Sequence, residues 1–182
     1  MSRGAPGAVR GPALALALAL SLAGGCSGLP EAALPGLPGA PPAPPATSPP
    51  AGPTYPEVEA RVHELINRHR ASRRLAPLAS DAAVAAVARR HSEQMAAGRT
   101  PFGHDGFDSR AAEIRRVQTF RAMAENVAYD SRTPAAERLV ASWLASPGHL
   151  SNIEGQFQVS GVGVARSPDG LYYATQIFLR TQ

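Results

Sequence analysis

The sequence has 182 residues and a net charge of +4, with 18 arginines, no lysine, 14 acidic residues and a single cysteine. This length accommodates one ordinary domain with appended segments. The arginines are spread along the chain without a dense basic run, and aromatic residues make up only 5% of it, which argues against a nucleic-acid-binding protein.

Residues 1–25 have the features of an export signal. Arg3 and Arg10 precede an apolar run over residues 13–23, which is too short for a membrane span because a spanning helix needs about 20 residues. Small residues then lead to Cys26, in a pattern that resembles the cleavage box of bacterial lipoproteins. There the cysteine becomes the new N-terminus and carries acyl chains. The alternative is ordinary signal cleavage nearby, which would leave Cys26 as a free thiol.

Residues 26–53 are predicted to be a disordered tether that follows the lipidated cysteine. Ten prolines lie among residues 27–53, and such a segment favours the extended polyproline conformation and forms no packed core. The tether could reach about 80 Å from a membrane. Residues 54–182 are expected to form one domain that is stable without disulfides, since they contain no cysteine.

Two helices are predicted at the start of the domain. Thr54 and Glu57 favour a capping box for the first helix, which extends to about Ser72. Asp81, with Ser80 before it, is the predicted cap of the second, which ends at Gly98. On one face of the first helix, helical spacing places Val58, Val62, Leu65, Ile66 and His69. The predicted buried stripe of the second helix is Val84, Val87, Ala88, His91 and Met95. The histidines of these helices are interpreted as packing or surface residues: His63, His69 and His91.

The middle of the domain is predicted to contain loops and short elements. The loop between the first two helices is expected to insert Leu75 and Leu78 into the core. Residues 100–107 are a predicted loop, residues 109–116 a short charged helix, and residues 123–129 a loop that leads into a brief strand.

A third amphipathic helix is predicted to begin at Thr133 and Pro134, because proline is favoured at the first helical position. Its inner face carries Leu139, Val140, Trp143 and Leu144. The sequence Ser146-Pro147-Gly148 is predicted to end this helix and to place His149 on a loop.

The last segment predicts an antiparallel hairpin. Residues 159–165 and 171–179 have strand character, and Ser167-Pro168-Asp169-Gly170 between them is a turn sequence. Helices followed by a hairpin indicate an α+β fold in which helices cover a small sheet.

Several stretches, by their order along the chain, resemble the CAP superfamily of cysteine-rich secretory, antigen 5 and pathogenesis-related proteins, in its short bacterial form. They are Leu75-Ala76-Pro77-Leu78, Gly103-His104-Asp105-Gly106-Phe107, Ala124-Glu125-Asn126-Val127, and Trp143 with Ser146-Pro147-Gly148-His149 and Asn152-Ile153. Gly161-Val162-Gly163 and Tyr172-Tyr173 with Thr175-Gln176 follow. The resemblance implies an α-β-α sandwich with a small antiparallel sheet between helical layers.

The resemblance also implies a central cleft. In eukaryotic members two histidines and two glutamates face this cleft and can hold a divalent metal. By motif, His104 matches the first histidine, Glu125 one glutamate and His149 the second histidine. Ser146 stands where the second glutamate normally lies, which weakens a four-ligand site and any mechanism that needs two carboxylates.

Three functions are compatible with these residues. His104, Glu125 and His149 could hold a catalytic zinc, because two imidazoles and a carboxylate are a known first shell for this metal. Alternatively, Ser146 or Ser92 could be a hydrolase nucleophile with His149 as base and Glu125 orienting it, although no nucleophile-elbow motif is present.

The third function, which we favour, is binding without catalysis. Polar cleft groups flanked by Phe102, Phe107 and Tyr129 would orient a small molecule, a lipid or an envelope polymer. The fourth interpretation is structural, with His and Glu only bonding loops together. We expect a monomeric lipoprotein of the cell envelope, on the outer membrane or the cell surface.

Overall fold

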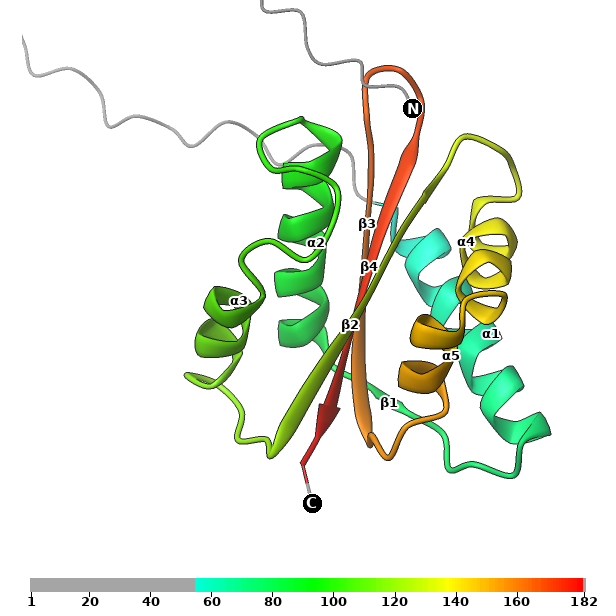
Figure 1. The fold of residues 1–182 in the computed structure, drawn as a ribbon, viewed down its shortest axis with the longest axis vertical. Helices are drawn as coiled ribbons and strands as arrows, with labels where there is room; N and C mark the ends of the chain where they lie inside the picture. Colours follow the sequence, from blue (N-terminus) through cyan, green and yellow to red (C-terminus); the bar gives the residue numbers. More distant parts are fainter. Residues whose placement is uncertain (1–54, 182) are drawn as a thin grey trace, which may run out of the picture. The chain divides into compact units, whose positions relative to one another are not determined.

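A computed structural model describes residues 55–181, which form five helices and four strands (Figure 1). The predicted signal, Cys26, the tether and Thr54 lie outside these residues. The elements in order are α1 (Pro56–Ser72), β1 (Ala79–Ser80), α2 (Ala82–Ala96), α3 (Phe107–Ile114), β2 (Ala122–Asp130), α4 (Ala135–Leu144), α5 (Pro147–Ile153), β3 (Val159–Arg166) and β4 (Tyr172–Arg180).

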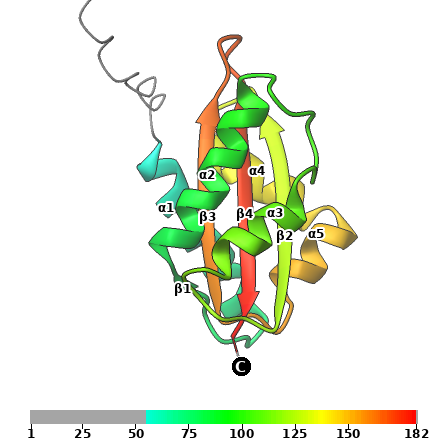
Figure 2. The same cartoon turned by 90° about the vertical axis from the view of Figure 1, so that its left-hand side faces the viewer.

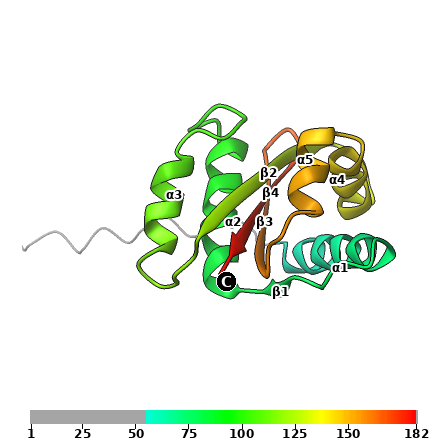
Figure 3. The same cartoon turned by 60° about the horizontal axis from the view of Figure 1, so that its bottom comes forward.

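The sheet separates two helical layers, so the predicted α-β-α arrangement is confirmed. Strand order is β1-β3-β4-β2, with β2 at one edge. Helices α2 and α3 cover one face, and α1, α4 and α5 cover the other (Figures 1 and 3). The β3–β4 and β2–β4 pairs are antiparallel, but the two-residue β1 runs parallel to β3, which makes the sheet mixed.

Each face of the sheet has its own apolar core. On the α1, α4 and α5 side, Trp143 and Phe178 are fully buried, with Val62, Ile66, Leu139 and Ile153 around them. On the α2 and α3 side, Val84, Val87 and Ala88 pack with Ile114, Ile177 and Leu179. All five residues predicted for the inner stripe of α2 are buried, including His91.

The beginning of α1 differs from the predicted capping box. The N-cap position is Tyr55, without a side-chain cap, and Pro56 occupies the first turn. Proline suits this position because its missing N–H would have no intrahelical partner. The predicted end at Ser72 is confirmed. Of the two leucines expected in the following loop, only Leu78 is buried.

Helix α2 lies directly on β3 (Figure 2) because two glycines of that strand have no side chain. A Cβ at Gly161 would lie 2.2 Å from the backbone N of Ala85, and one at Gly163 would lie 2.0 Å from the N of Arg89. Asp81 begins the helix as predicted, by accepting a hydrogen bond from the N of Val84.

Two predictions for the middle of the chain were wrong. Residues 122–130 form a full strand, β2, rather than a loop and a brief strand, because every residue from Ala122 to Asp130 has a partner in β4. His149 lies in helix α5 rather than on a loop. Pro147 follows the end of α4 but also occupies the first turn of α5, so the same proline begins a new helix.

A buried arginine fixes the end of α1 to the segment after α5. Arg70 donates to the carbonyl oxygens of Ala76 at 2.9 Å, Ile153 at 2.7 Å and Gly155 at 3.0 Å. The desolvation that accompanies this burial lowers the pKa of Arg70. The contacts satisfy carbonyls at the end of α5, where helix geometry leaves acceptors without partners.

Candidate functional site

The site is built around the carboxylate of Glu125 on β2, whose side chain is 1% exposed. Arg110 of α3 donates to it through Nε, 2.7 Å from Oε2, and through Nη2, 2.7 Å from Oε1. His104 Nδ1 lies 2.9 Å from Oε1. Because a carboxylate oxygen accepts, Nδ1 of His104 carries the hydrogen in this pair. The carboxylate of Glu125 therefore forms a buried, bidentate ion pair with Arg110 and also accepts a hydrogen bond from His104.

The loop that carries His104 is held by several backbone contacts. Arg110 donates from Nη1 to the carbonyl of Asp105 at 2.7 Å and from Nη2 to that of His104 at 3.3 Å. Nε2 of His91 lies 2.9 Å from the carbonyl of Gly103. His91 was predicted to be a packing or surface residue. Its ring is buried, and it also fixes this loop through the contact with Gly103.

His104 is accessible despite these constraints, with a side chain that is 53% exposed. With Nδ1 donating to Glu125, Nε2 is the ring nitrogen left to contact a ligand. The loop thus presents one oriented imidazole at the surface.

The second predicted histidine belongs to the other helical layer. Asn126, adjacent to Glu125, donates to the carbonyl of His149 at 3.1 Å, and Asn152 donates to Oδ1 of Asn126 at 2.9 Å. Successive strand side chains point to opposite faces, so Glu125 faces α3 while Asn126 faces α5. His104 therefore lies on the α3 side and His149 on the α5 side of the edge strand β2, and His104 is near enough for its charge to lower the pKa of His149.

The environment of His149 favours the neutral ring. Burial lowers the pKa of His149, and the nearby charge of His104 lowers it further. Its Nδ1 is buried and has no hydrogen-bond partner among the described residues. The structure therefore brings His104 to Glu125 by direct contact, and His149 to their vicinity, without a contact between His149 and the carboxylate.

The two candidate serines have different surroundings. Ser92 is fully buried, where its Oγ donates to the carbonyl of Gly163 and lies 2.9 Å from Oγ1 of Thr175. Ser146 is half-buried at the N-cap position of α5, without a side-chain cap. Within residues 55–181, neither hydroxyl is hydrogen-bonded to His149, so the contacts of a serine triad are not present.

Exposed aromatic rings gather near the end of β2, and one of them, Phe102, lies two residues before His104. The rings of Phe102 and Tyr129 meet edge to face, with their centroids 4.9 Å apart, and Tyr129 stacks on Tyr173 with a centroid separation of 5.7 Å. Phe102 is 48% and Tyr129 51% exposed. We call Phe102, Tyr129 and Tyr173 the aromatic surface. Phe107, also predicted to flank the cleft, is half-buried at the start of α3.

The donor set does not fit a zinc site in this arrangement. Among residues 55–181, no three His, Cys, Asp or Glu side chains are grouped so that they could hold a metal ion. A cation at Glu125 would compete with the guanidinium of Arg110, which already takes both carboxylate oxygens.

Comparison with protein families identifies this architecture. The family model CAP, described as "Cysteine-rich secretory protein family", matches residues 63–178. The chain belongs to the CAP family. The matched residues include all four predicted site residues of the CAP domain: His104, Glu125, Ser146 and His149.

Solved structures share the fold. An extracellular SCP-domain protein of Bacillus anthracis is 29% identical, with a TM-score of 0.55, 71% of this chain covered and 45% of that one. A cysteine-rich secretory protein of Staphylococcus aureus is 23% identical, with a TM-score of 0.58, and coverage is 72% and 40%. An outer surface protein of Borrelia burgdorferi is 20% identical, with a TM-score of 0.57 and coverage of 69% and 94%.

Two of these relatives are much longer than this chain. The chain spans less than half the length of the Bacillus and Staphylococcus proteins. No curated protein matches the chain. In the CAP domain described here, residues 55–181, no helix is long and apolar enough to cross a membrane.

Sequence reasoning missed the groups that hold the site together. Arg110 is one of 18 arginines, and no local pattern distinguishes it from the exposed ones. Asn126 and Asn152 lie in the motifs that carry the family resemblance, but their contact depends on α5 packing against β2. Only the motif positions themselves could have indicated these two amides.

Proposed function

We propose that this protein is a lipoprotein of the bacterial cell envelope that displays a monomeric CAP domain, and that the domain binds a small apolar or amphiphilic ligand. Cys26 would carry the acyl chains and residues 26–53 would form the tether. The aromatic surface and His104 would contact the ligand. The observation that carries the binding role is the exposure of two large aromatic rings, one of them in the loop that carries the oriented, exposed imidazole of His104.

The state of Glu125 supports binding over catalysis. A general base needs a free lone pair within reach of its substrate. Both oxygens of Glu125 accept hydrogen bonds from Arg110, and one also lies at 2.9 Å from His104. The side chain is also only 1% exposed, which keeps the carboxylate out of reach of a substrate, and its role is to orient His104.

The chemistry of the surface selects the ligand. Aromatic rings remove apolar area from water when a ligand covers them, and they dominate the energetics of many binding sites. Nε2 of His104 would offer one polar partner from the loop that also carries Phe102. A ligand with an apolar body and one polar group matches both features.

A fluorescence titration tests the ligand class. The probe is a dansyl-labelled fatty acid, and the protein is the full chain with Cys26→Ser, which keeps attached acyl chains out of the preparation. We expect saturable binding that Phe102→Ser and Tyr129→Ser each weaken about tenfold, equivalent to about 1.4 kcal/mol. Val117→Ser is the matched control, because Val117 is 69% exposed and lies outside the aromatic surface. Equal affinities for all four proteins would contradict the proposal.

The anchor is tested separately in cells that express the full chain. Feeding an alkyne-labelled palmitate should label the wild-type protein and direct it to the detergent-rich phase after phase separation. Cys26→Ser should abolish the label, since Cys26 is the only thiol in the chain. Labelling that persists in this variant, or none in the wild type, would refute the lipoprotein assignment without affecting the ligand proposal.

A further inference from the structure

Exposed arginines gather in the α3–β2 connection, residues 115–121. Arg115, Arg116 and Arg121 all belong to it, and all three are exposed. The backbone N of Arg121 donates to the carbonyl of Arg180 at 2.7 Å, so the last residue of β4, which is also exposed, lies beside the connection. The connection therefore lies at the end of the sheet where β2 begins and β4 ends (Figures 1 and 2).

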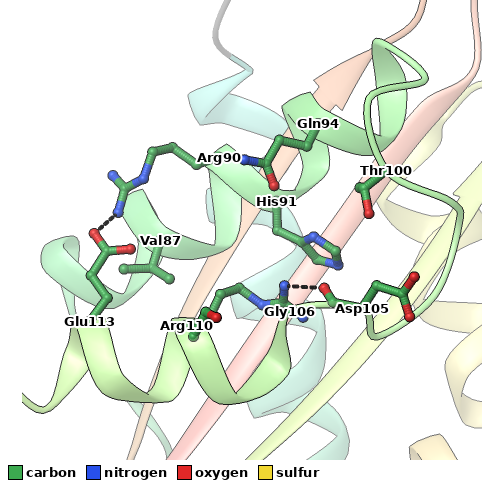
Figure 4. Close-up of a pocket in the computed structure, with 10 residues that line it drawn as sticks. Val87, Arg90, His91, Gln94, Thr100, Asp105, Gly106, Arg110 and Glu113 are labelled. Atoms are coloured by element: carbon green, nitrogen blue, oxygen red, sulfur yellow. Dashed lines mark hydrogen bonds and ion pairs between the residues drawn. The ribbon is translucent and has the colours of Figure 1, made fainter.

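No acidic side chain neutralises these charges. Within residues 55–181, none of the three arginines of the connection forms an ion pair. The nearest acid along the chain is Glu113, and it pairs with Arg90 instead (Figure 4). The guanidinium of Arg115 lies 4.6 Å from the centre of the Phe120 ring, a contact that leaves its charge in place. The connection thus presents three uncompensated positive charges.

An apolar side chain lies among these charges. Val117 follows Arg116 directly and is 69% exposed, more than either exposed ring of the aromatic surface. The backbone N atoms of Val117 and Gln118 both donate to the carbonyl of Ile114, a fully buried core residue. The turn is therefore fixed to the core while its valine stays in water. One exposed valine is ordinary on a protein surface, but an exposed valine among unpaired arginines is an amphipathic surface.

The opposite end of the sheet carries charges of both signs. Arg166 and Asp169 lie in and beside the turn from β3 to β4. Helix α2 also ends there (Figure 1), and Arg99 follows its last residue by three positions. The ring of Tyr55 packs on that of Tyr172 at the start of β4, so the chain enters the domain at this end. The basic connection is thus at the end remote from the entry of the chain.

This remote position is within reach of the membrane that the proposed anchor would occupy. Strand β4 has nine residues and spans about 30 Å, whereas the predicted tether could extend about 80 Å. A domain held by such a tether can turn its basic end toward the same bilayer. To this extent the inference rests on the proposed function.

We propose that the α3–β2 connection docks on a bilayer that contains anionic phospholipids. Arg115, Arg116 and Arg121 contact the headgroup phosphates, and Val117 enters the interface between headgroups and acyl chains. Arginines near an anionic membrane surface each favour binding about fivefold. A soluble polyanion would match the arginines equally well but offers no apolar phase to Val117. The valine therefore favours a lipid surface as the partner.

The test uses the full chain with Cys26→Ser, in which Val117→Cys supplies the only thiol for the environment-sensitive fluorophore nitrobenzoxadiazole. Vesicles contain phosphatidylglycerol and phosphatidylcholine in equal amounts, or phosphatidylcholine alone. We expect the emission to rise and shift to the blue on the anionic vesicles only. At about 1 M salt the rise should disappear, because the Debye length falls to about 3 Å. Arg116→Gln and Arg121→Gln should each weaken the partition about fivefold.

Arg99→Gln is the matched control, because Arg99 is exposed, has no ion pair within the CAP domain described and lies at the other end of the sheet. It should leave the partition unchanged, and the fluorophore attached through Arg99→Cys should not respond. An equal rise on neutral vesicles, or an equal response at position 99, would overturn the proposal. Vesicle binding without a response at position 117 would also overturn it, since the arginines would then bind an anion without insertion.

The outcome is independent of the other two proposals. The test protein lacks Cys26, so a negative result leaves the lipid anchor untouched. Phe102→Ser should not change the partition, because Phe102 belongs to the aromatic surface. A loss of vesicle binding in Phe102→Ser that Arg121→Gln does not share would show that the aromatic surface faces the bilayer, and would overturn docking through the α3–β2 connection.

Discussion

Two regions on the same side of the sheet are held together by opposite means. Where α2 crosses β3, the contact depends on the absence of side chains at Gly161 and Gly163, which lets the two backbones approach each other. At the edge strand β2, contact depends on charged hydrogen bonds, because Arg110 joins Glu125 to the carbonyls of the His104 loop.

The two kinds of contact have different consequences, one for the stability of the domain and the other for the position of His104. Close apolar packing is non-directional and tolerates little change in volume. Buried charge-assisted hydrogen bonds are directional, and their net contribution to stability is small compared with the cost of removing one partner. The α2–β3 contact therefore sets whether the domain folds, and the Arg110–Glu125 pair sets where His104 points.

The largest effect is expected from Gly163→Ala. The new Cβ would meet the backbone of Arg89 at 2.0 Å, so α2 must move off the sheet. Overpacking typically costs about 1–3 kcal/mol, and a clash with backbone should reach or exceed the top of that range. Chemical denaturation measures the loss. Gly148→Ala is the control, because its Cβ would meet nothing within 4 Å, and we expect stability to stay equal or rise by about 0.5 kcal/mol.

Glu125→Gln should have the next largest effect on stability. It removes the anion beside Arg110, whose side chain is 9% exposed, and leaves a buried cation without compensation. The expected loss is about 3 kcal/mol. Glu64→Gln is the matched control, because Glu64 pairs with Arg61 and Arg68 at the exposed surface, and its loss should stay below about 1 kcal/mol. Similar losses in both variants would show that the Arg110 pair is no more important than a surface ion pair.

A smaller effect is expected from pH, through His91. Burial, with Arg110 and His104 contributing, lowers the pKa of His91 below its ordinary 6.5, while Gly103 and Glu125 oppose the shift. The unfolded chain therefore binds more protons than the folded one below pH 6.5. The stability from this neutral ring is complete above pH 6.5 and is lost as the pH falls toward the folded pKa. His91→Asn should flatten the decline of unfolding free energy with falling pH, and an unchanged slope would assign the decline to other groups.

The smallest effect is expected from added zinc. Arg110 holds both oxygens of Glu125, so calorimetry should detect no stoichiometric binding at micromolar zinc. A one-to-one complex in the wild type that Glu125→Gln abolishes would instead place His104, Glu125 and His149 in one metal site and reopen the catalytic hypothesis.

The sequence was informative where local rules dominate. Asp81 as a cap, the buried stripe of α2 and the final hairpin follow from propensity and periodicity. It failed at β2, because Glu125 and Asn126 interrupt the apolar pattern of a strand, and their partners come from distant segments. It failed again at His149, since Pro147 can end one helix or begin the next, and only packing of α5 against β2 decides between them.

The sequence by itself determined the family, the helical layers around a sheet, and the identity of the residues that could form a site. Those features depend on residue types and their spacing, which are local properties. The tertiary structure decided that Glu125 belongs to Arg110, and that His104 and His149 lie on opposite sides of the edge strand β2. These relations join residues far apart in the chain, and their energies depend on burial and orientation that no local pattern encodes.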